Sequence, residues 1–102
     1  MQKQQQHRDR YDILRNILTI VDNTRPLYRN QMNKTRIGYT AGLTHARTVE
    51  YIKQLIDLEL LVRMEFKPFF AYYEITERGR RCLQLFDEME DDLRPATADK
   101  LN

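Results

Sequence analysis

Arg47 and His45 are the side chains best suited to read a nucleic acid, because they lie in the first turn of a segment with helical spacing, Thr44 to Leu60. An exposed arginine at such a position can donate two hydrogen bonds to O6 and N7 of a guanine, a contact that discriminates between bases by roughly 1–3 kcal/mol. The alternative is that both are ordinary solvated side chains. The pattern favours base contact for Arg47 and leaves both interpretations open for His45.

A second group that could contact DNA precedes this segment, at Lys34, Thr35 and Arg36. These residues begin another short helical segment, where positive charge and backbone amides without intrahelical partners suit phosphate binding. Such contacts position a protein on DNA without reading its sequence. The full set of predicted DNA-contacting residues is Lys34, Thr35, Arg36, Thr44, His45, Arg47, Thr48, Tyr51, Arg63 and Lys67.

Residues that could support catalysis or metal binding are sparse. His7 and His45 lie 38 positions apart, which is not the spacing of a metal site, and the only cysteine, Cys82, has no second cysteine or acid and histidine arrangement to activate it. The acids of the run 87–92 form a surface cluster with no partner base. The sequence therefore predicts no enzyme activity, no cofactor and no metal, and Cys82 is interpreted as a small core residue.

The two groups of DNA-contacting residues are expected on a pair of helices joined by a tight turn. Asn33 can cap the first helix, in which Ile37 and Ala41 share one face, while Gly42 supplies a left-handed residue and Thr44 caps the second helix. The core positions expected on the second helix are Val49, Ile52, Leu55, Ile56 and Leu60. This is the helix-turn-helix layout, in which the second helix enters the major groove. By spacing alone, other helical hairpins share it.

Three motifs add a family resemblance: KTRIGYTAGLT, YIKQL and YEITERGRRCL. Together they resemble the small archaeal winged-helix proteins that bind DNA as dimers, over roughly Tyr11 to Phe86. The resemblance implies a homodimer, an archaeal setting and a role in transcription or chromatin. The chain departs from the pattern in a longer segment between its first two helices, in Glu59 where a glycine usually ends the recognition helix, and in a short final helix.

The segments around the helix pair complete a winged helix. Seven apolar residues from Tyr11 to Val21 predict a first core helix over Arg8 to Asn23. The connection that follows contains Pro26 and is expected to hold a short strand at Leu27 to Arg29, the place of the first strand in winged-helix folds.

Two runs, 61–67 and 71–76, predict a β-hairpin whose tip, about Phe66 to Ala71, is the wing. Tyr73 and Ile75 should face the core and Tyr72 and Glu74 the solvent. Arg63 and Lys67 are predicted to lie over a phosphate or the minor groove. The pair Phe69 and Phe70 is unusually apolar for a tip, so the wing either folds back on the core or meets another chain.

The last predicted helix, residues 77–93, begins after the cap Thr76 and carries an apolar stripe with the spacing of a coiled-coil seam. The predicted dimer interface consists of Cys82, Leu85, Phe86, Met89 and Leu93. A parallel pair would set the acidic run 87–92 against its own copy. An antiparallel homodimer is therefore expected, with this run facing Arg78, Arg80 and Arg81 of the partner.

Charge and length fix the remaining expectations. Residues 1–54 hold ten Lys and Arg against four Asp and Glu, a balance of +6, whereas residues 55–102 hold seven against eleven, a balance of −4. The basic half, which contains the helix pair, should face DNA.

The 102 residues predict one small, mainly helical α+β domain. The predicted parts are a disordered lead-in (1–7), a winged-helix domain (8–76), a dimerisation helix (77–93) and a flexible tail (94–102). With no signal peptide or long apolar run, the chain is expected in the cytoplasm, associated with the nucleoid, without membrane or small-molecule partners. The predicted function is double-stranded DNA binding by a homodimeric regulator or chromatin protein, and the alternative is a protein-interaction module without DNA affinity.

Overall fold

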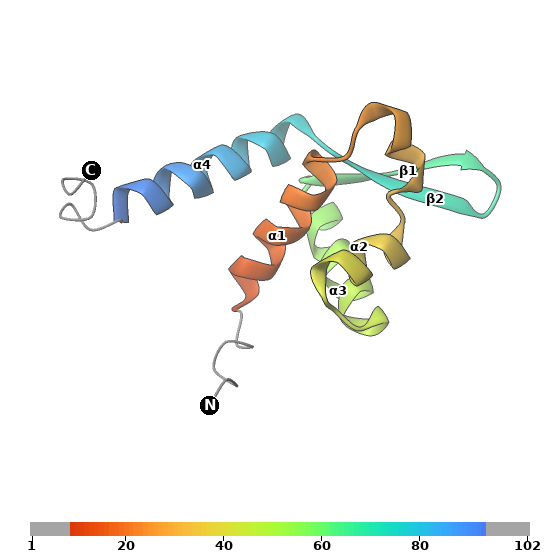
Figure 1. The fold of residues 1–102 in the computed structure, drawn as a ribbon, viewed down its shortest axis with the longest axis horizontal. Helices are drawn as coiled ribbons and strands as arrows, with labels where there is room; N and C mark the ends of the chain where they lie inside the picture. The colour runs from red at the N-terminus through yellow and green to blue at the C-terminus, as the bar shows by residue number, and fades with distance from the viewer. Residues whose placement is uncertain (1–8, 94–102) are drawn as a thin grey trace.

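The computed structural model describes residues 9–93, which form a winged helix with an additional C-terminal helix (Figure 1). The elements in chain order are α1 (Arg10–Asp22), the 3-10 helix η2 (Pro26–Gln31), α2 (Lys34–Ala41), α3 (His45–Asp57), β1 (Leu61–Lys67), β2 (Phe70–Ile75) and α4 (Glu77–Leu93). The predicted fold class, mainly helical with a two-stranded antiparallel sheet, is confirmed. The predicted lead-in and tail lie outside the described residues. None of the helices in residues 9–93 is long and apolar enough to cross a bilayer.

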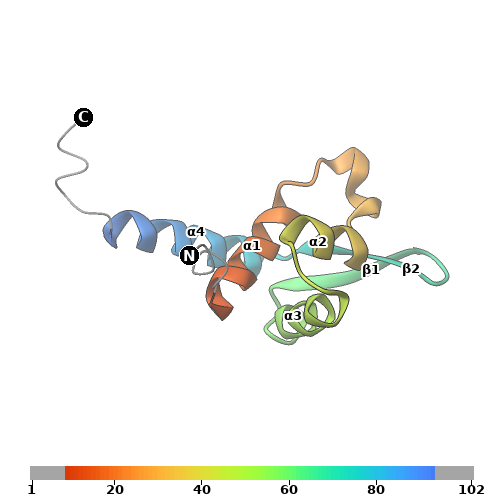
Figure 2. The same ribbon diagram turned by 60° about the horizontal axis from the view of Figure 1, so that its bottom comes forward.

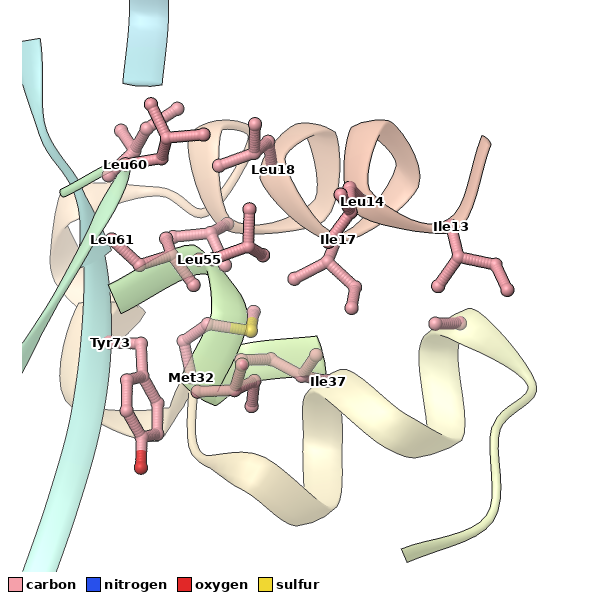
Figure 3. Packing of buried hydrophobic residues seen from close by; sticks show 14 of the residues in the cluster. Ile13, Leu14, Ile17, Leu18, Met32, Ile37, Leu55, Leu60, Leu61 and Tyr73 are labelled. Atoms are coloured by element: carbon pink, nitrogen blue, oxygen red, sulfur yellow. The ribbon is translucent and has the colours of Figure 1, made fainter. Parts of the chain in front are cut away.

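Helix α1 supplies the largest share of the core. Its first turn is capped by Asp9, whose side chain accepts the amide of Asp12 at 2.9 Å. The buried residues of α1 are Ile13, Leu14, Ile17, Leu18 and Val21. They belong to one buried cluster with residues of α2, α3 and the sheet, and Figure 3 shows Ile13 and Ile17 on the side of α1 that faces α2. Tyr11, expected on the same stripe, is exposed instead, because it lies in the first turn at the edge of that stripe.

The connection after α1 contains no strand at residues 27–29, so that expectation is wrong. Pro26 fixes a helical φ at the first position of a turn, and the segment continues as the 3-10 helix η2. One backbone hydrogen bond stands where a third strand would pair: the amide of Tyr73 donates to the carbonyl of Met32 at 3.0 Å. Arg29 of η2 adds an ion pair with Glu74 of β2 at 3.4 Å.

Helix α2 begins and ends as its sequence predicts. Asn33 accepts the amide of Arg36 at 2.9 Å. At the other end Gly42 adopts φ 71°, and the amide of Leu43 donates to the carbonyl of Gly38 at 2.9 Å. This bond and the left-handed residue define a Schellman motif, which turns the chain directly into α3.

Helix α3 ends in the same motif, with a less suitable residue at the left-handed position. Glu59 adopts φ 63°, and the amide of Leu60 donates to the carbonyl of Leu55 at 2.8 Å. Leu55 and Leu60 are both buried, which is the apolar contact that accompanies this motif. Of the other predicted core positions of α3, Ile52 is buried, Ile56 is half-buried and Val49 is exposed.

The sheet joins the helices to the wing. Strand β1 pairs with β2 from Leu61 opposite Ile75 to Lys67 opposite Phe70, with an irregularity between Glu65 and Lys67. Tyr73 and Ile75 are buried as predicted, while Tyr72 and Glu74 on the other face are half-buried. The core therefore lies between one face of a short hairpin and the three helices α1 to α3 (Figures 1 and 3).

Helix α4 starts against the end of α3. The hydroxyl of Thr76 donates to the carbonyl of Glu59 at 2.7 Å and accepts the amide of Gly79 at 2.9 Å, which confirms Thr76 as the cap. A Cβ on Gly79 would clash with the carbonyl oxygen of Leu60. Beyond Leu83, the buried anchor of this helix, the C-terminal half of α4 projects away from the domain (Figures 1 and 2).

Candidate nucleic-acid interface

The first turn of α3 presents Arg47 beside the ring of Tyr51. Thr44 caps the helix by accepting the amide of Arg47 at 3.2 Å. The Arg47 guanidinium lies 5.6 Å from the centroid of the Tyr51 ring, and its Nη2 donates to the Tyr51 hydroxyl at 3.3 Å. Tyr51 is half-buried against the core, so it supports Arg47 as well as lining the same face. An arginine braced in this way loses less side-chain entropy on binding a guanine.

Thr48 is not available to DNA, so its inclusion among the contact residues is wrong. Its exposed fraction is 0%, and its hydroxyl donates to the carbonyl of Thr44 at 2.8 Å. The side chain fills the space between α3 and α2 beside Gly38. Thr48 stands four positions before the buried Ile52, and this spacing places it on the core face.

The outer face of α3 carries both basic and acidic side chains. His45 and Arg47 are exposed in its first turn, followed by Glu50 and Lys53. An arginine can donate to a guanine, and a glutamate can accept a hydrogen bond from N4 of a cytosine. Because Glu50 would repel a nearby phosphate, this face is not uniformly attractive to a polyanion.

The residues predicted to bind phosphates lie at the start of α2. Thr35 and Arg36 are exposed and Lys34 is half-buried. Since Asn33 already accepts the amide of Arg36, a phosphate there would use the two preceding amides together with the side chains of Lys34 and Arg36.

A groove joins the start of α2 to the wing. It is lined by Asn30, Gln31, Asn33, Thr35, Arg36, Tyr39, Phe66 and Phe70. Tyr39, whose exposed fraction is 88%, is a candidate contact residue that sequence reasoning missed. The available signal was helical phase, because Tyr39 stands two positions after the buried Ile37 and so lies on the opposite face of α2.

The wing brings Lys67 next to aromatic rings. Its ammonium lies 5.5 Å from the ring centroids of both Phe66 and Phe70. Arg63, the other predicted contact on the hairpin, pairs with Glu65 at 2.8 Å. The hydrogen bond that Arg63 donates to Glu65 is the main cause that raises the pKa of Arg63 above its ordinary value. Lys67 is therefore better placed than Arg63 to meet a phosphate.

The predicted dimer residues divide into two groups. Cys82 and Phe86 are half-buried, and Cys82 packs against the core of its own domain, whereas Leu85, Met89 and Leu93 are exposed. Some of the charged side chains expected to pair across an antiparallel dimer already form ion pairs within the chain. Arg15 of α1 binds Asp87 at 2.9 Å and Glu90 at 2.6 Å, and Arg80 binds Asp22 at 3.4 Å. The pKa of Arg15 is raised, chiefly by its hydrogen bond to Glu90.

These features define a winged helix-turn-helix domain, with a capped recognition helix, a basic helix start before it and a hairpin wing. The family model for winged helix-turn-helix domains matches residues 7–93, and the chain belongs to this family. Comparison with curated proteins gives no match. The family indicates DNA binding in general and is typically not enzymatic. In residues 9–93, no group of three or more His, Cys, Asp or Glu is placed to hold a metal ion.

Proposed function

We propose that this protein is a homodimeric transcriptional regulator that binds double-stranded DNA, with α3 in the major groove and the wing against the backbone. The observation that carries the proposal is Arg47. It is exposed at the start of α3, held by the Tyr51 ring at 5.6 Å, and positioned where a recognition helix reaches base edges.

Three separated segments support a duplex as the partner. Arg47 on α3, Lys34 and Arg36 on α2, and Lys67 on the wing supply positive charge at three places on the domain. Arg36 and the wing residue Phe66 line one groove, so the start of α2 and the wing can meet the same DNA. A backbone contact on either side of the recognition helix would fix its register in the groove.

The composition of α3 favours regulation at particular sites over packaging of any sequence. A chromatin protein that covers DNA regardless of sequence gains from an entirely basic surface, and Glu50 opposes that use. At a cognate site Glu50 would instead accept a hydrogen bond from a cytosine next to the guanine bound by Arg47. Archaeal origin and nucleoid association, implied by the KTRIGYTAGLT and YEITERGRRCL motifs, belong to the same proposal.

The exposed part of α4 and the requirements of specific DNA recognition support the proposed homodimer. Leu85, Met89 and Leu93 continue an exposed apolar stripe along the part of α4 that projects from the domain (Figure 1). Two recognition helices held by one dimer can read half-sites about one helical turn apart. A second copy of the chain would cover the stripe.

A protein-interaction module remains the second candidate, and the exposed phenylalanines of the wing favour it. Phe69 and Phe70 could dock on an apolar partner surface while the acidic end of α4 stays in solvent. The two functions differ in whether basic residues of α2 and α3 govern binding to DNA.

A salt-dependent titration against random and genomic duplexes tests the proposal. Arg47→Ala should weaken binding at the preferred sequence by roughly 1–3 kcal/mol, about 5- to 150-fold. Lys34→Ala and Arg36→Ala should weaken binding to all sequences and each flatten the salt slope by about 1. If all three site variants bind like the parent protein, the helix-turn-helix is not the DNA surface.

A further inference from the structure

We propose that the ring of Phe69, at the tip of the wing, inserts from the minor groove between two base pairs and kinks the duplex. This inference rests on the proposed DNA binding and assigns to the wing tip a role beyond contact with the backbone. It makes the protein a DNA-bending regulator, with Phe69 as the wedge.

The tip is built to hold one aromatic ring away from the protein. Lys67 pairs with Phe70, so Pro68 and Phe69 form a two-residue turn. Phe69 adopts φ 70°, a backbone conformation that is costly for a bulky side chain and usually taken by glycine or asparagine. Its exposed fraction is 96%, so no contact within the described chain explains the aromatic residue there. Backbone strain combined with an exposed ring is typical of a functional position.

The surroundings of the tip favour a polyanion over a protein surface. Residues 66–71 contain Lys67 and no acid, and Glu65 just outside this range is paired with Arg63. The Lys67 ammonium lies 5.5 Å from the centroids of the Phe66 and Phe70 rings, which holds a cation at the base of the turn that carries Phe69. A phosphate bound by Lys67 would place the adjacent turn at the edge of a groove.

The groove beside the wing provides a path for one DNA strand. Its lining includes Arg36 and Tyr39 from α2 and Phe66 and Phe70 from the hairpin, and it contains no Asp or Glu. A backbone held at the start of α2 would pass along this groove, and the tip of the hairpin extends beyond the helices, at the end of the molecule away from α4 (Figures 1 and 2). The ring of Phe69 would then reach the minor groove next to the major groove occupied by α3.

The size and chemistry of the side chain suit this role. The minor groove is only about 6 Å wide, so it admits an extended segment or a single ring but not a helix. Apolar side chains such as phenylalanine and leucine are the wedges that proteins insert between base steps, and the resulting kinks are roughly 20–90°. The unstacking of one step is offset by the additional contacts that a bent duplex makes with the protein.

The experiment compares the parent protein with Phe69→Ala and Phe69→Leu on a duplex of the preferred sequence. Fluorescence energy transfer between the labelled DNA ends reports bending, and 2-aminopurine placed along the duplex reports unstacking. The parent should bend DNA by roughly 20–90°, and Phe69→Leu should retain most of the bend because leucine can also act as a wedge. Phe69→Ala should lose both signals while keeping the salt slope, because the ring carries no charge.

Other results separate failure of the wedge from failure of the proposed function. A parent protein that binds duplex DNA through Arg47 without bending it overturns the wedge and leaves DNA binding intact, whereas one that binds no duplex overturns both. If Phe69→Ala dissociates a DNA-free oligomer, the wing is a protein interface, and the inference is wrong. Binding to an unpaired oligonucleotide more tightly than to the duplex, with dependence on Phe69, overturns it in favour of base stacking on a single strand.

Discussion

Gly38 of α2 packs directly against Thr48 of α3: a Cβ built on Gly38 would lie 2.5 Å from the Thr48 Oγ1 atom. The hydroxyl cannot turn away freely, because it donates to the carbonyl of Thr44 at 2.8 Å. The absence of a side chain at Gly38 thus sets how closely the two helices of the helix-turn-helix approach. Since the cap of α3 is Thr44 itself, this contact also ties the spacing of the helices to the residue that positions Arg47.

Gly38→Ala should therefore destabilise the fold by about 1–3 kcal/mol, the usual cost of overpacking a close contact. Removing the hydroxyl should relieve part of that cost. In a double-mutant cycle measured by urea unfolding, Thr48→Ala combined with Gly38→Ala should lose less stability than the two single variants lose together. Free energies that add to within about 0.5 kcal/mol would show that the contact does not limit the approach of the helices.

Gly42 should be sensitive to substitution for a different reason. A Cβ at this position would meet no atom within 4 Å, but φ is 71°, so the penalty arises from the backbone alone. Gly42→Ala should cost about 1–2 kcal/mol, and Gly42→Asn should cost less because asparagine tolerates the left-handed region better. The larger and β-branched Gly42→Val should also shift α3 and weaken DNA binding. Thermal melting of the three variants checks the order, and equal melting temperatures for the parent and Ala variants would contradict it.

Glu59 offers the opposite opportunity, because it occupies the equivalent left-handed position at the end of α3 with φ 63°. Glu59→Gly should stabilise the protein by about 1 kcal/mol, which would raise the melting temperature by about 4–8 °C for a domain of this size. The carbonyl that accepts the Thr76 hydroxyl is retained. Glu59→Ala is the control, since it removes the same side chain without relieving the backbone. A gain of equal size in the Ala variant would assign the effect to the carboxylate.

Much of the fold could be predicted from local sequence, because its signals act over a few residues. Asn33, Thr44 and Thr76 cap helices as expected, and Gly42 is left-handed. The alternation of side chains along β2 correctly predicted that Tyr73 and Ile75 are buried. The strand predicted at residues 27–29 rests on the usual order of elements in winged-helix folds, and this prediction is wrong. Pro26 favours a helical turn, and the segment forms a 3-10 helix.

The candidate site was predicted less completely, because it depends on helical phase and on distant contacts. Thr48 was included among the predicted DNA contacts, although its spacing from Ile52 places it in the core. Tyr39 was overlooked on the exposed face of α2. The engagement of Glu90 by Arg15, 75 positions earlier in the chain, requires α1 and α4 to be packed together before it can be recognised. No local pattern carries that information.

The last prediction concerns the dimer. Met89 lies at the centre of the exposed stripe formed by Leu85, Met89 and Leu93, whose exposed fractions are 62%, 57% and 78%. At micromolar concentration the parent should sediment as a dimer and Met89→Asp as a monomer, because a carboxylate buried between two helices without a partner costs several kcal/mol. Met89 is remote from the buried anchor Leu83, so the variant should keep the helical circular dichroism of the parent.

Two further variants decide how the result is interpreted. Gln84→Asp adds the same charge to an exposed position of α4 outside the stripe and should remain a dimer. Phe86→Asp should also give a monomer, although its half-buried position makes a loss of stability expected as well.

Because Arg15 already binds Asp87 and Glu90, and Arg80 binds Asp22, the proposed antiparallel dimer would depend less on charge than the sequence implies and more on burial of the stripe. Dissociation of the dimer should accordingly depend only weakly on salt between about 0.1 and 0.5 M, where surface ion pairs are progressively screened. A parent that sediments as a monomer overturns the dimer, and a dimer unaffected by both Met89→Asp and Phe86→Asp has its interface on another element.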